Sequence, residues 1–134
     1  MAQSLEHVGD GHRDLVDAQA VGCDVRHQVV AGDVGISVED SSGARVHHNN
    51  ALGGVGAGIV IFASSSGRIE HNSAQGPRGI DVSGGSCGNA FEYNSAVGSL
   101  FGFYSEENPS APCNTFAKNR SATAFPSLKF WGAK

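Results

Sequence analysis

A repeat with a period in the low twenties constrains the fold of this chain more than any other feature of its sequence. Each unit contains an apolar residue followed three positions later by asparagine, and then a Gly-apolar pair. Successive asparagines are separated by 23, 22 and 25 residues, and successive glycines by 23, 21 and 23 residues. A loosely spaced repeat of this length is typical of a solenoid, in which every unit forms one coil and stacks on the next. The repeated residues are Asn49, Asn72, Asn94 and Asn119, and Gly35, Gly58, Gly79 and Gly102.

The apolar residues that follow each glycine alternate with other residues, as in Ile59-x-Ile61. A period of two predicts short β-strands and not helices. Two further short runs in each unit supply single inward apolar positions, so that three strands separated by Gly, Ser and Asn describe one coil of a parallel β-helix. We therefore expect an all-β fold, a single-stranded parallel β-helix of about five coils of 21–25 residues. Equivalent strands of neighbouring coils should lie about 4.8 Å apart.

The repeat also suggests how the chain is divided. We expect the coils to span residues 25–124. Residues 1–24 hold enough apolar residues for either a degenerate first coil or a short N-terminal cap, and the sequence leaves both open. Residues 125–134 carry Phe130 and Trp131, whose size suits a C-terminal cap over the unpaired strand edges at the end of a solenoid. The same two side chains offer an alternative, a contact through which the chain forms a homo-oligomer.

The repeated asparagine is expected to form the corner between the second and third strands of each coil. Asparagine tolerates the left-handed backbone conformation better than most residues. Its side-chain amide both donates and accepts, so amides that lie above one another can hydrogen-bond along the stack. The sequence therefore predicts a structural asparagine ladder, formed by Asn49, Asn72, Asn94 and Asn119, with Gln28 in the preceding coil.

Composition argues against several classes of partner. The chain has 9 Lys and Arg against 13 Asp and Glu, a formal net charge of −4, so a nucleic-acid partner is not expected. It contains no apolar run of transmembrane length and no cationic-then-apolar leader, so we expect neither a membrane partner nor a signal peptide in this chain. Its 19 glycines, about twice the usual share, suit a fold with many tight turns.

The apolar-x-x-Asn and Gly-Ile-x-apolar pattern resembles the right-handed parallel β-helix repeat proteins of the pectate-lyase-like superfamily, which includes the NosD-like repeats. The resemblance covers about residues 25–124. It implies a right-handed β-helix and a carbohydrate-binding or carbohydrate-processing role, with lyase, epimerase or hydrolase chemistry if the chain is an enzyme. The superfamily also holds phage tail spikes and proteins of no known activity. The alternative is therefore a non-catalytic structural or assembly segment of a surface or secreted protein.

The enzymes that the chain resembles place a polysaccharide on the outward face of the Gly-Ile strand. Alternation puts Asp81 and Tyr104 on that face, with Arg78, Glu39 and Asp40 near the strand ends. Asp81 and Arg78 are the candidate catalytic residues, and Tyr104, Asp81, Glu39 and Asp40 are the candidate substrate-binding residues. An aromatic ring such as that of Tyr104 suits the apolar face of a sugar. The resemblance makes Ca²⁺ the one cofactor to consider, although the sequence shows no complete set of ligands or of acid-base partners.

A column of polar and ring-bearing residues lies directly before the asparagine ladder. A metal ion needs ligands that converge on one point, whereas parallel side chains on successive coils diverge, so no metal site is predicted. We interpret these residues as exposed polar residues of the turns. They are His27, His48, His71, Tyr93 and Lys118, with His47 next to His48.

Two of the three cysteines fall at equivalent places in neighbouring units. Cys87 and Cys113 precede the equivalent core positions Phe91 and Phe116 by four and three residues. They form either a disulfide or two reduced thiols that lie side by side. A disulfide favours a secreted or cell-surface protein, whereas the unpaired Cys23 weakens that interpretation.

Overall fold

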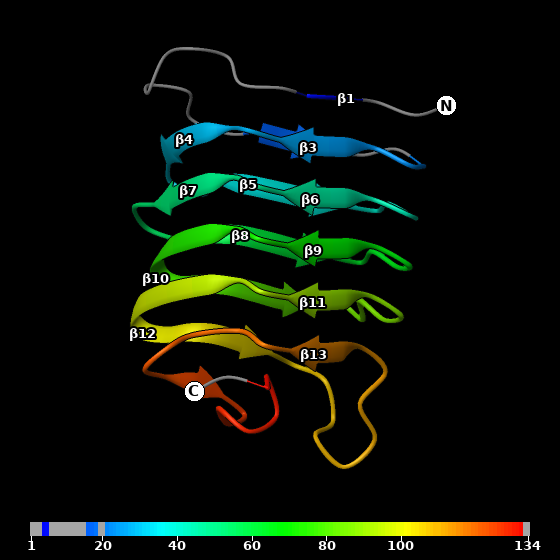
Figure 1. The fold of residues 1–134 in the computed structure, drawn as a ribbon, viewed down its shortest axis with the longest axis vertical. Helices are drawn as coiled ribbons and strands as arrows, with labels where there is room; N and C mark the ends of the chain where they lie inside the picture. Colours follow the sequence, from blue (N-terminus) through cyan, green and yellow to red (C-terminus); the bar gives the residue numbers. More distant parts are fainter. Residues whose placement is uncertain (1–3, 6–15, 19–20, 133–134) are drawn as a thin grey trace.

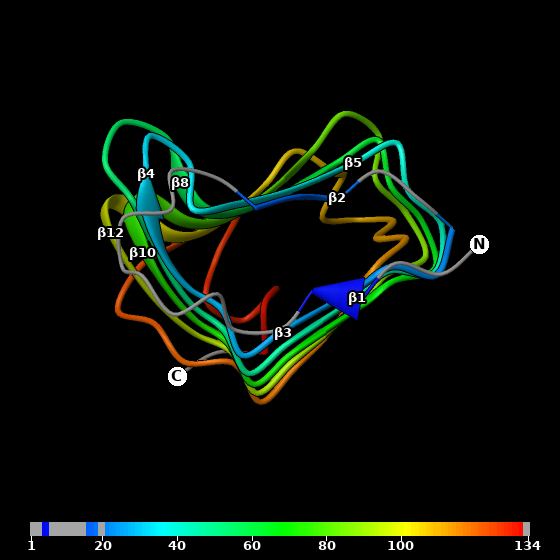
Figure 2. The same ribbon diagram turned by 90° about the horizontal axis from the view of Figure 1, so that it is seen from above.

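The computed structural model describes residues 4–5, 16–18 and 21–132, and within this part every regular element is a β-strand. All pairings between these strands are parallel. Successive coils stack along the long axis of the molecule (Figure 1), and they enclose a common interior when seen along that axis (Figure 2). The expected all-β parallel solenoid is therefore confirmed. No helix in the described part has the length and apolar character needed to span a bilayer.

One sheet is built from the run that precedes each asparagine. Its three-residue strands have an apolar residue at the centre, which points into the interior, and equivalent residues pair directly with one another, as Val46 does with Ile69. The sheet has six strands in the order β1 (Ser4–Leu5), β3 (Asp24–Arg26), β6 (Arg45–His47), β9 (Arg68–Glu70), β11 (Ala90–Glu92) and β13 (Thr115–Ala117).

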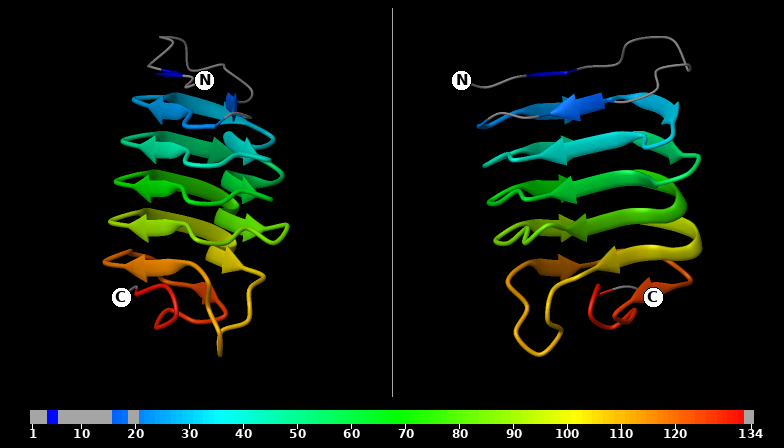
Figure 3. Two further views of the ribbon diagram at one scale, coloured as in Figure 1. Left: turned by 90° about the vertical axis from the view of Figure 1, so that its right-hand side faces the viewer. Right: turned by 180° about the vertical axis from the view of Figure 1, so that it is seen from behind.

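The second sheet joins the other two runs of each unit. In its longest strands the third run of one coil continues into the first run of the next, and the two 11-residue strands shift register between Gly76 and Arg78, on either side of Pro77. This continuous path replaces the two separate strands that the sequence predicted (Figure 3). Its strands are β14 (Ala124–Phe125), β12 (Ser95–Ser105), β10 (Ser73–Ser83), β8 (Ala57–Phe62), β5 (Ile36–Glu39) and β2 (Val16–Ala18), beside which β4 (Val29–Gly32) pairs with β7 (Asn50–Gly53).

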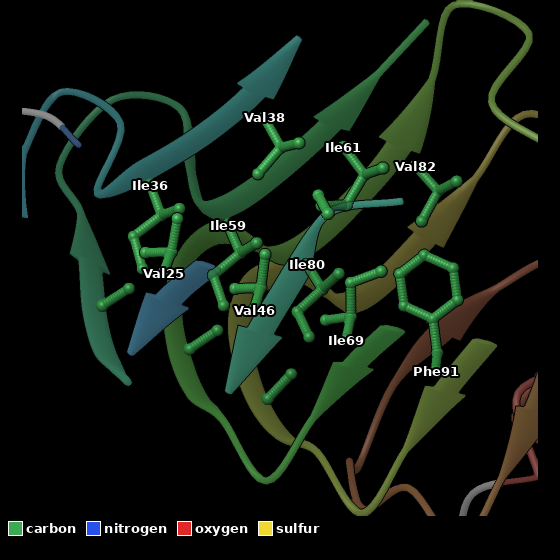
Figure 4. Packing of buried hydrophobic residues seen from close by; sticks show 14 of the residues in the cluster. Val25, Ile36, Val38, Val46, Ile59, Ile61, Ile69, Ile80, Val82 and Phe91 are labelled. Carbon is green, nitrogen blue, oxygen red and sulfur yellow. The ribbon is translucent and has the colours of Figure 1, made fainter. Parts of the chain in front are cut away.

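The core consists of columns of identical or similar side chains, one from each coil. Figure 4 shows these side chains pointing from the strands into the shared interior. The column through Ile59 and Ile80 is completely buried, and the glycine before each isoleucine lies too close to neighbouring backbone to carry a side chain. A Cβ at Gly79, for example, would lie 2.5 Å from the carbonyl oxygen of Gly102. The Gly-Ile half of the repeat is therefore a packing requirement.

The C-terminal end of the core is closed by the chain itself. The indole of Trp131 is completely buried, and its ring centroid lies 4.5 Å from those of both Phe103 and Phe116. Its Nε1 donates a hydrogen bond of 3.1 Å to the carbonyl of Phe125. Trp131 is therefore part of the core, and the alternative that the C-terminal end with Phe130 and Trp131 forms an oligomer contact stays a prediction. At the other end, most of residues 1–24 lie outside the described residues. The two alternatives for this segment, a cap and a degenerate first coil, therefore both stay predictions.

A ladder of buried amides follows the corner of every coil. Asn49 Nδ2 donates to Asn72 Oδ1 over 3.0 Å, Asn72 to Asn94 over 3.0 Å, and Asn94 to Asn119 over 3.1 Å. Each Nδ2 also donates to a backbone carbonyl of the coil before it. The last amide donates to the carbonyl of Trp131, which ends the ladder at the cap.

We predict that Asn49→Ala destabilises the protein by about 2–5 kcal/mol, because the buried backbone N–H of Gln28 and the carbonyl of Val25 lose their partner. Asn50→Ala is the matched control, since this neighbouring asparagine is exposed, and it should change stability by less than about 0.5 kcal/mol. Urea or thermal unfolding of both variants measures the difference. Equal stabilities would contradict a structural role for the ladder.

Candidate functional site

The outward face of the Gly-Ile strands carries the first candidate residues. The register places Ser37, Val60, Asp81 and Tyr104 in one column, and Phe125 follows Tyr104. Asp81 borders a groove of about 320 Å³, which the exposed side chains of Val55 and Leu100 also line. The face therefore brings one carboxylate close to an apolar rim.

Arg78 and Asp81 are paired with each other. A nitrogen of the Arg78 guanidinium lies 2.8 Å from Oδ2 of Asp81. Burial lowers the pKa of Arg78, but the hydrogen bond and the charge of Asp81 outweigh it, and the pKa is raised above its ordinary value. The two candidate catalytic groups therefore neutralise one another in this structure.

Tyr104 is packed on both sides. The guanidinium carbon of Arg78 lies 3.6 Å from its ring centroid, and the ring of Phe125 stacks at 5.3 Å with an interplanar angle of 19°. Arg78 belongs to β10 and Phe125 to β14, which flank β12 on opposite sides, so the two groups cover opposite faces of the ring. The edge and the hydroxyl of Tyr104 are therefore the parts of this side chain that a ligand could reach, and its role in substrate binding stays a prediction.

Glu39 and Asp40 do not join this group. Glu39 accepts a hydrogen bond of 2.7 Å from Ser37 Oγ, and Asp40 is exposed in the turn that follows β5, with φ of 48°. Strand β5 is separated from β10 by β8, a distance of about 9–10 Å at the usual strand spacing. The four predicted substrate-binding residues are therefore spread over several coils.

Cys87 and Cys113 are joined by a disulfide, with their Cα atoms 5.2 Å apart. The bond anchors the loop that precedes β13, and within this loop Glu107 accepts hydrogen bonds from the backbone N–H groups of Cys113 and Asn114. Cys23 is a buried free thiol whose pKa is raised by burial. The bridge holds a loop in place and contributes no group to the candidate faces.

A second and larger groove runs along the corner outside the asparagine ladder. Its volume is about 620 Å³. We call it the histidine groove. Its lining is formed by His27, Gln28, Val29, His48, Asn49, Asn50, His71, Asn72, Ser73 and Tyr93.

One wall of the histidine groove is a stack of rings from successive coils. His48 lies between His27 and His71, with centroid distances of 5.7 and 5.1 Å and interplanar angles of 21° and 11°. His71 stacks on Tyr93 at 4.9 Å and 3°. The Tyr93 hydroxyl in turn accepts a hydrogen bond of 2.8 Å from Nζ of Lys118. We call this continuous stack, from His27 to Tyr93, the ring ladder.

The backbone at the ring ladder corrects the expected position of the left-handed residue. That conformation belongs to the residue before each ladder amide, with φ between 55° and 57° at His27, His48, His71, Tyr93 and Lys118. The asparagine itself then points inward. Tyrosine and lysine are costly in this conformation, by about 1–2 kcal/mol relative to the right-handed form, whereas glycine or asparagine would adopt it readily. Strained positions of this kind often mark functional surfaces.

His47, a histidine outside the ring ladder, connects the ladder to a carboxylate. Its Nε2 lies 2.9 Å from Oδ1 of Asp24, and its Nδ1 lies 3.0 Å from Nδ1 of His48. Burial lowers the pKa of His48, as do His47, His71 and His27, with a partial offset from Glu70. The sequence showed the histidines but gave no sign of Asp24, which reaches His47 only through the pairing of β3 with β6.

Strands β6 and β9, beside the ring ladder, carry charged side chains that pair with one another. Glu70 accepts hydrogen bonds of 3.1 Å from both Arg45 and Arg68. Burial raises the pKa of Glu70, but the two arginines outweigh it and hold the pKa below its ordinary value of 4.5. In the described part of the chain, no three His, Cys, Asp or Glu side chains are grouped so that they could hold a metal ion.

Comparison with known proteins identifies the fold family. A family model described as "Right handed beta helix region" matches residues 19–96, more than half of the chain. No curated protein and no solved structure matches this chain significantly.

We predict that Glu70→Gln lowers the melting temperature at pH 7, because the uncharged amide cannot form the ion pairs that Glu70 forms with Arg45 and Arg68. A carboxylate whose pKa is depressed in the folded state stabilises the fold above the unfolded value, and this contribution disappears as the pH falls through the folded value. The difference between wild type and variant should therefore shrink below pH 4.5.

Glu92→Gln is the control, since Glu92 pairs with Glu70 in register and forms no ion pair within the described residues. Melting curves between pH 3 and 7 should show little effect of this change. A pH profile for Glu70→Gln that matches the control would contradict the assigned pairing.

Proposed function

The chain belongs to the right-handed β-helix family, and we propose that it binds a linear carbohydrate chain along the histidine groove. The observation that carries the proposal is the ring ladder, whose rings repeat every 4.9–5.7 Å parallel to the helix axis. A ligand that itself repeats along one direction can meet the same kind of group on every coil. A polysaccharide laid along the solenoid has this character.

The groove has the chemistry that suits a sugar polymer. Its volume lies within the range of about 300–1,000 Å³ typical of ligand sites. Beside the rings, the neighbouring strands contribute the exposed Asn50 and the half-buried Ser73, which are uncharged donors and acceptors for hydroxyl groups. Histidine and tyrosine edges supply apolar contact together with polar atoms. The lining therefore combines aromatic and neutral polar groups over several coils.

Binding is supported better than catalysis. General acid-base work on a glycosidic bond needs two groups on either side of it, with protonation states held apart by their surroundings. Asp81, the acid indicated by the sequence, is instead ion-paired with Arg78. The proposal is accordingly for a carbohydrate-binding β-helix, with the face around Asp81 as the competing location.

We predict that Tyr93→Asn weakens glycan binding about fivefold or more, because it removes the exposed ring at one end of the ladder. Asparagine is the appropriate replacement, since it adopts the left-handed conformation that Tyr93 occupies. A thermal-shift screen against neutral and acidic linear polysaccharides identifies the ligand first. A ligand at 100 times its dissociation constant raises stability by about 2.7 kcal/mol.

The matched control is Tyr104→Asn, the same substitution on the face around Asp81. Affinity of the selected glycan, measured by calorimetry, should be nearly unchanged in this variant. A loss of affinity in Tyr104→Asn and not in Tyr93→Asn would move the site to the Asp81 face. A folded protein that binds no glycan in the panel would count against the proposed function itself.

A further inference from the structure

The histidine groove is free of carboxylates on a protein that is acidic overall. None of its ten lining residues is Asp or Glu and three are histidines, whereas the whole chain has a formal net charge of −4. Two of the three acidic side chains on the adjoining strands are paired, Asp24 with His47 and Glu70 with two arginines, and Glu92 is the one without an ion pair among the described residues. The groove is therefore a strip where an anionic ligand meets little repulsion.

Hydrogen bonds set the tautomer of the central imidazole, His48, when its neighbour His47 is neutral. An ionised Asp24 only accepts, so Nε2 of His47 must donate to it, and Nδ1 of a neutral His47 must accept. The contact between the two Nδ1 atoms then requires Nδ1–H of His48 to donate. Nε2 of His48 consequently holds the free lone pair, and no side chain in the described part of the chain hydrogen-bonds to it. One proton added there converts the ring into a cation.

Charged groups flank the ring ladder on the strands that precede it. Those of β3, β6, β9 and β11 form a nearly balanced set, whereas the positions of β4, β7 and β10 that line the groove are uncharged. Near the β13 end the nearby groups are cations. The charged and titratable groups are Asp24 and Arg26, Arg45 and His47, Arg68 and Glu70, Glu92, and then Lys118 and Arg120.

The ladder geometry couples protonation to ligand binding. Neighbouring rings lie 5.1–5.7 Å apart, so adjacent imidazolium cations repel one another. An anionic chain in the groove would offset that repulsion and favour the protonated rings. If protonation of the rings raises the affinity for the ligand, then by linkage the binding of the ligand causes the rings to take up protons. Histidine is the side chain whose ordinary titration range lies between pH 5 and 8.

We propose that the histidine groove is a proton-gated site for a glycan chain that carries anionic groups, which it binds when the ring ladder is protonated and releases at neutral pH. The inference rests on the proposed function and adds its ligand class and its regulation. Three histidines, His27, His48 and His71, are the gate. The uncharged floor of the groove supplies the contacts to the sugar backbone that do not depend on pH.

The test uses dextran sulfate and unsubstituted dextran of equal chain length, titrated calorimetrically at pH 5.5 and 7.5. Sulfate esters stay ionised at both values, so only the protein titrates. Wild-type protein should bind dextran sulfate about tenfold or more tightly at pH 5.5 than at pH 7.5, with uptake of at least about one proton. The gain should be lost in 1 M salt, where the screening length falls to about 3 Å.

The decisive variant is His27→Asn/His48→Asn/His71→Asn. Asparagine accepts the left-handed conformation but cannot be protonated, so the pH dependence should disappear. If the triple variant does not fold, His71→Asn alone should still reduce the proton uptake. Arg78→Gln, on the other face, is the control and should leave both affinities unchanged.

Three results would overturn the inference. They are equal affinity of wild type for dextran sulfate at both pH values, a pH dependence that survives in the histidine variants, and a loss of affinity in Arg78→Gln. Dextran that binds equally at both pH values, without a gain for dextran sulfate at pH 5.5, would remove the gating and leave carbohydrate binding in place. The glycan panel with Tyr93→Asn decides the proposed function separately.

Discussion

Parallel strand pairing in register is the constraint on which the rest of this structure depends. Because each coil advances by one strand spacing, a residue in one coil lies directly above its equivalent in the next. Any side chain that recurs in the repeat is thereby turned into a column. The buried isoleucines, the ladder of amides and the ring ladder are three results of this one geometry, and an error of register would disrupt all three.

The corner of each coil links the structural and the candidate functional columns. A single left-handed residue turns the chain, so its side chain points outward while the amide after it points inward. Asn72 is buried and its Nδ2 donates two hydrogen bonds. His71 is exposed and has ring contacts on both sides. The same turn therefore places a saturated amide inside the fold and an adaptable imidazole outside it.

The period of the sequence was enough to predict the solenoid, because spacing and alternation depend only on backbone geometry. The sequence did not predict that the left-handed residue is the one before the asparagine. The spacing of Asn49 and Asn72 is the same whether the asparagine or the residue before it adopts that conformation. A further ladder, in which the backbone N–H of Ser41 donates to Ser64 Oγ and that of Ser64 to Ser86 Oγ, was also missed. Because serine is common in turns, the three serines of this ladder do not stand out in the sequence.

The pairing of side chains across coils was the property that the sequence predicted least well. The alternation placed Asp81 and Tyr104 on one face, but it could not show that Arg78 and Phe125 occupy the space around them. Long side chains choose partners by rotamer, and the rotamers depend on neighbours that become neighbours only after folding. The amides of Asn72, Asn94 and Asn119 each donate two hydrogen bonds and accept two, whereas no side chain among the described residues hydrogen-bonds to Nε2 of His48. The proposal of a binding site in the histidine groove therefore rests on ring atoms that are available to a ligand, and not on the resemblance to polysaccharide-active enzymes.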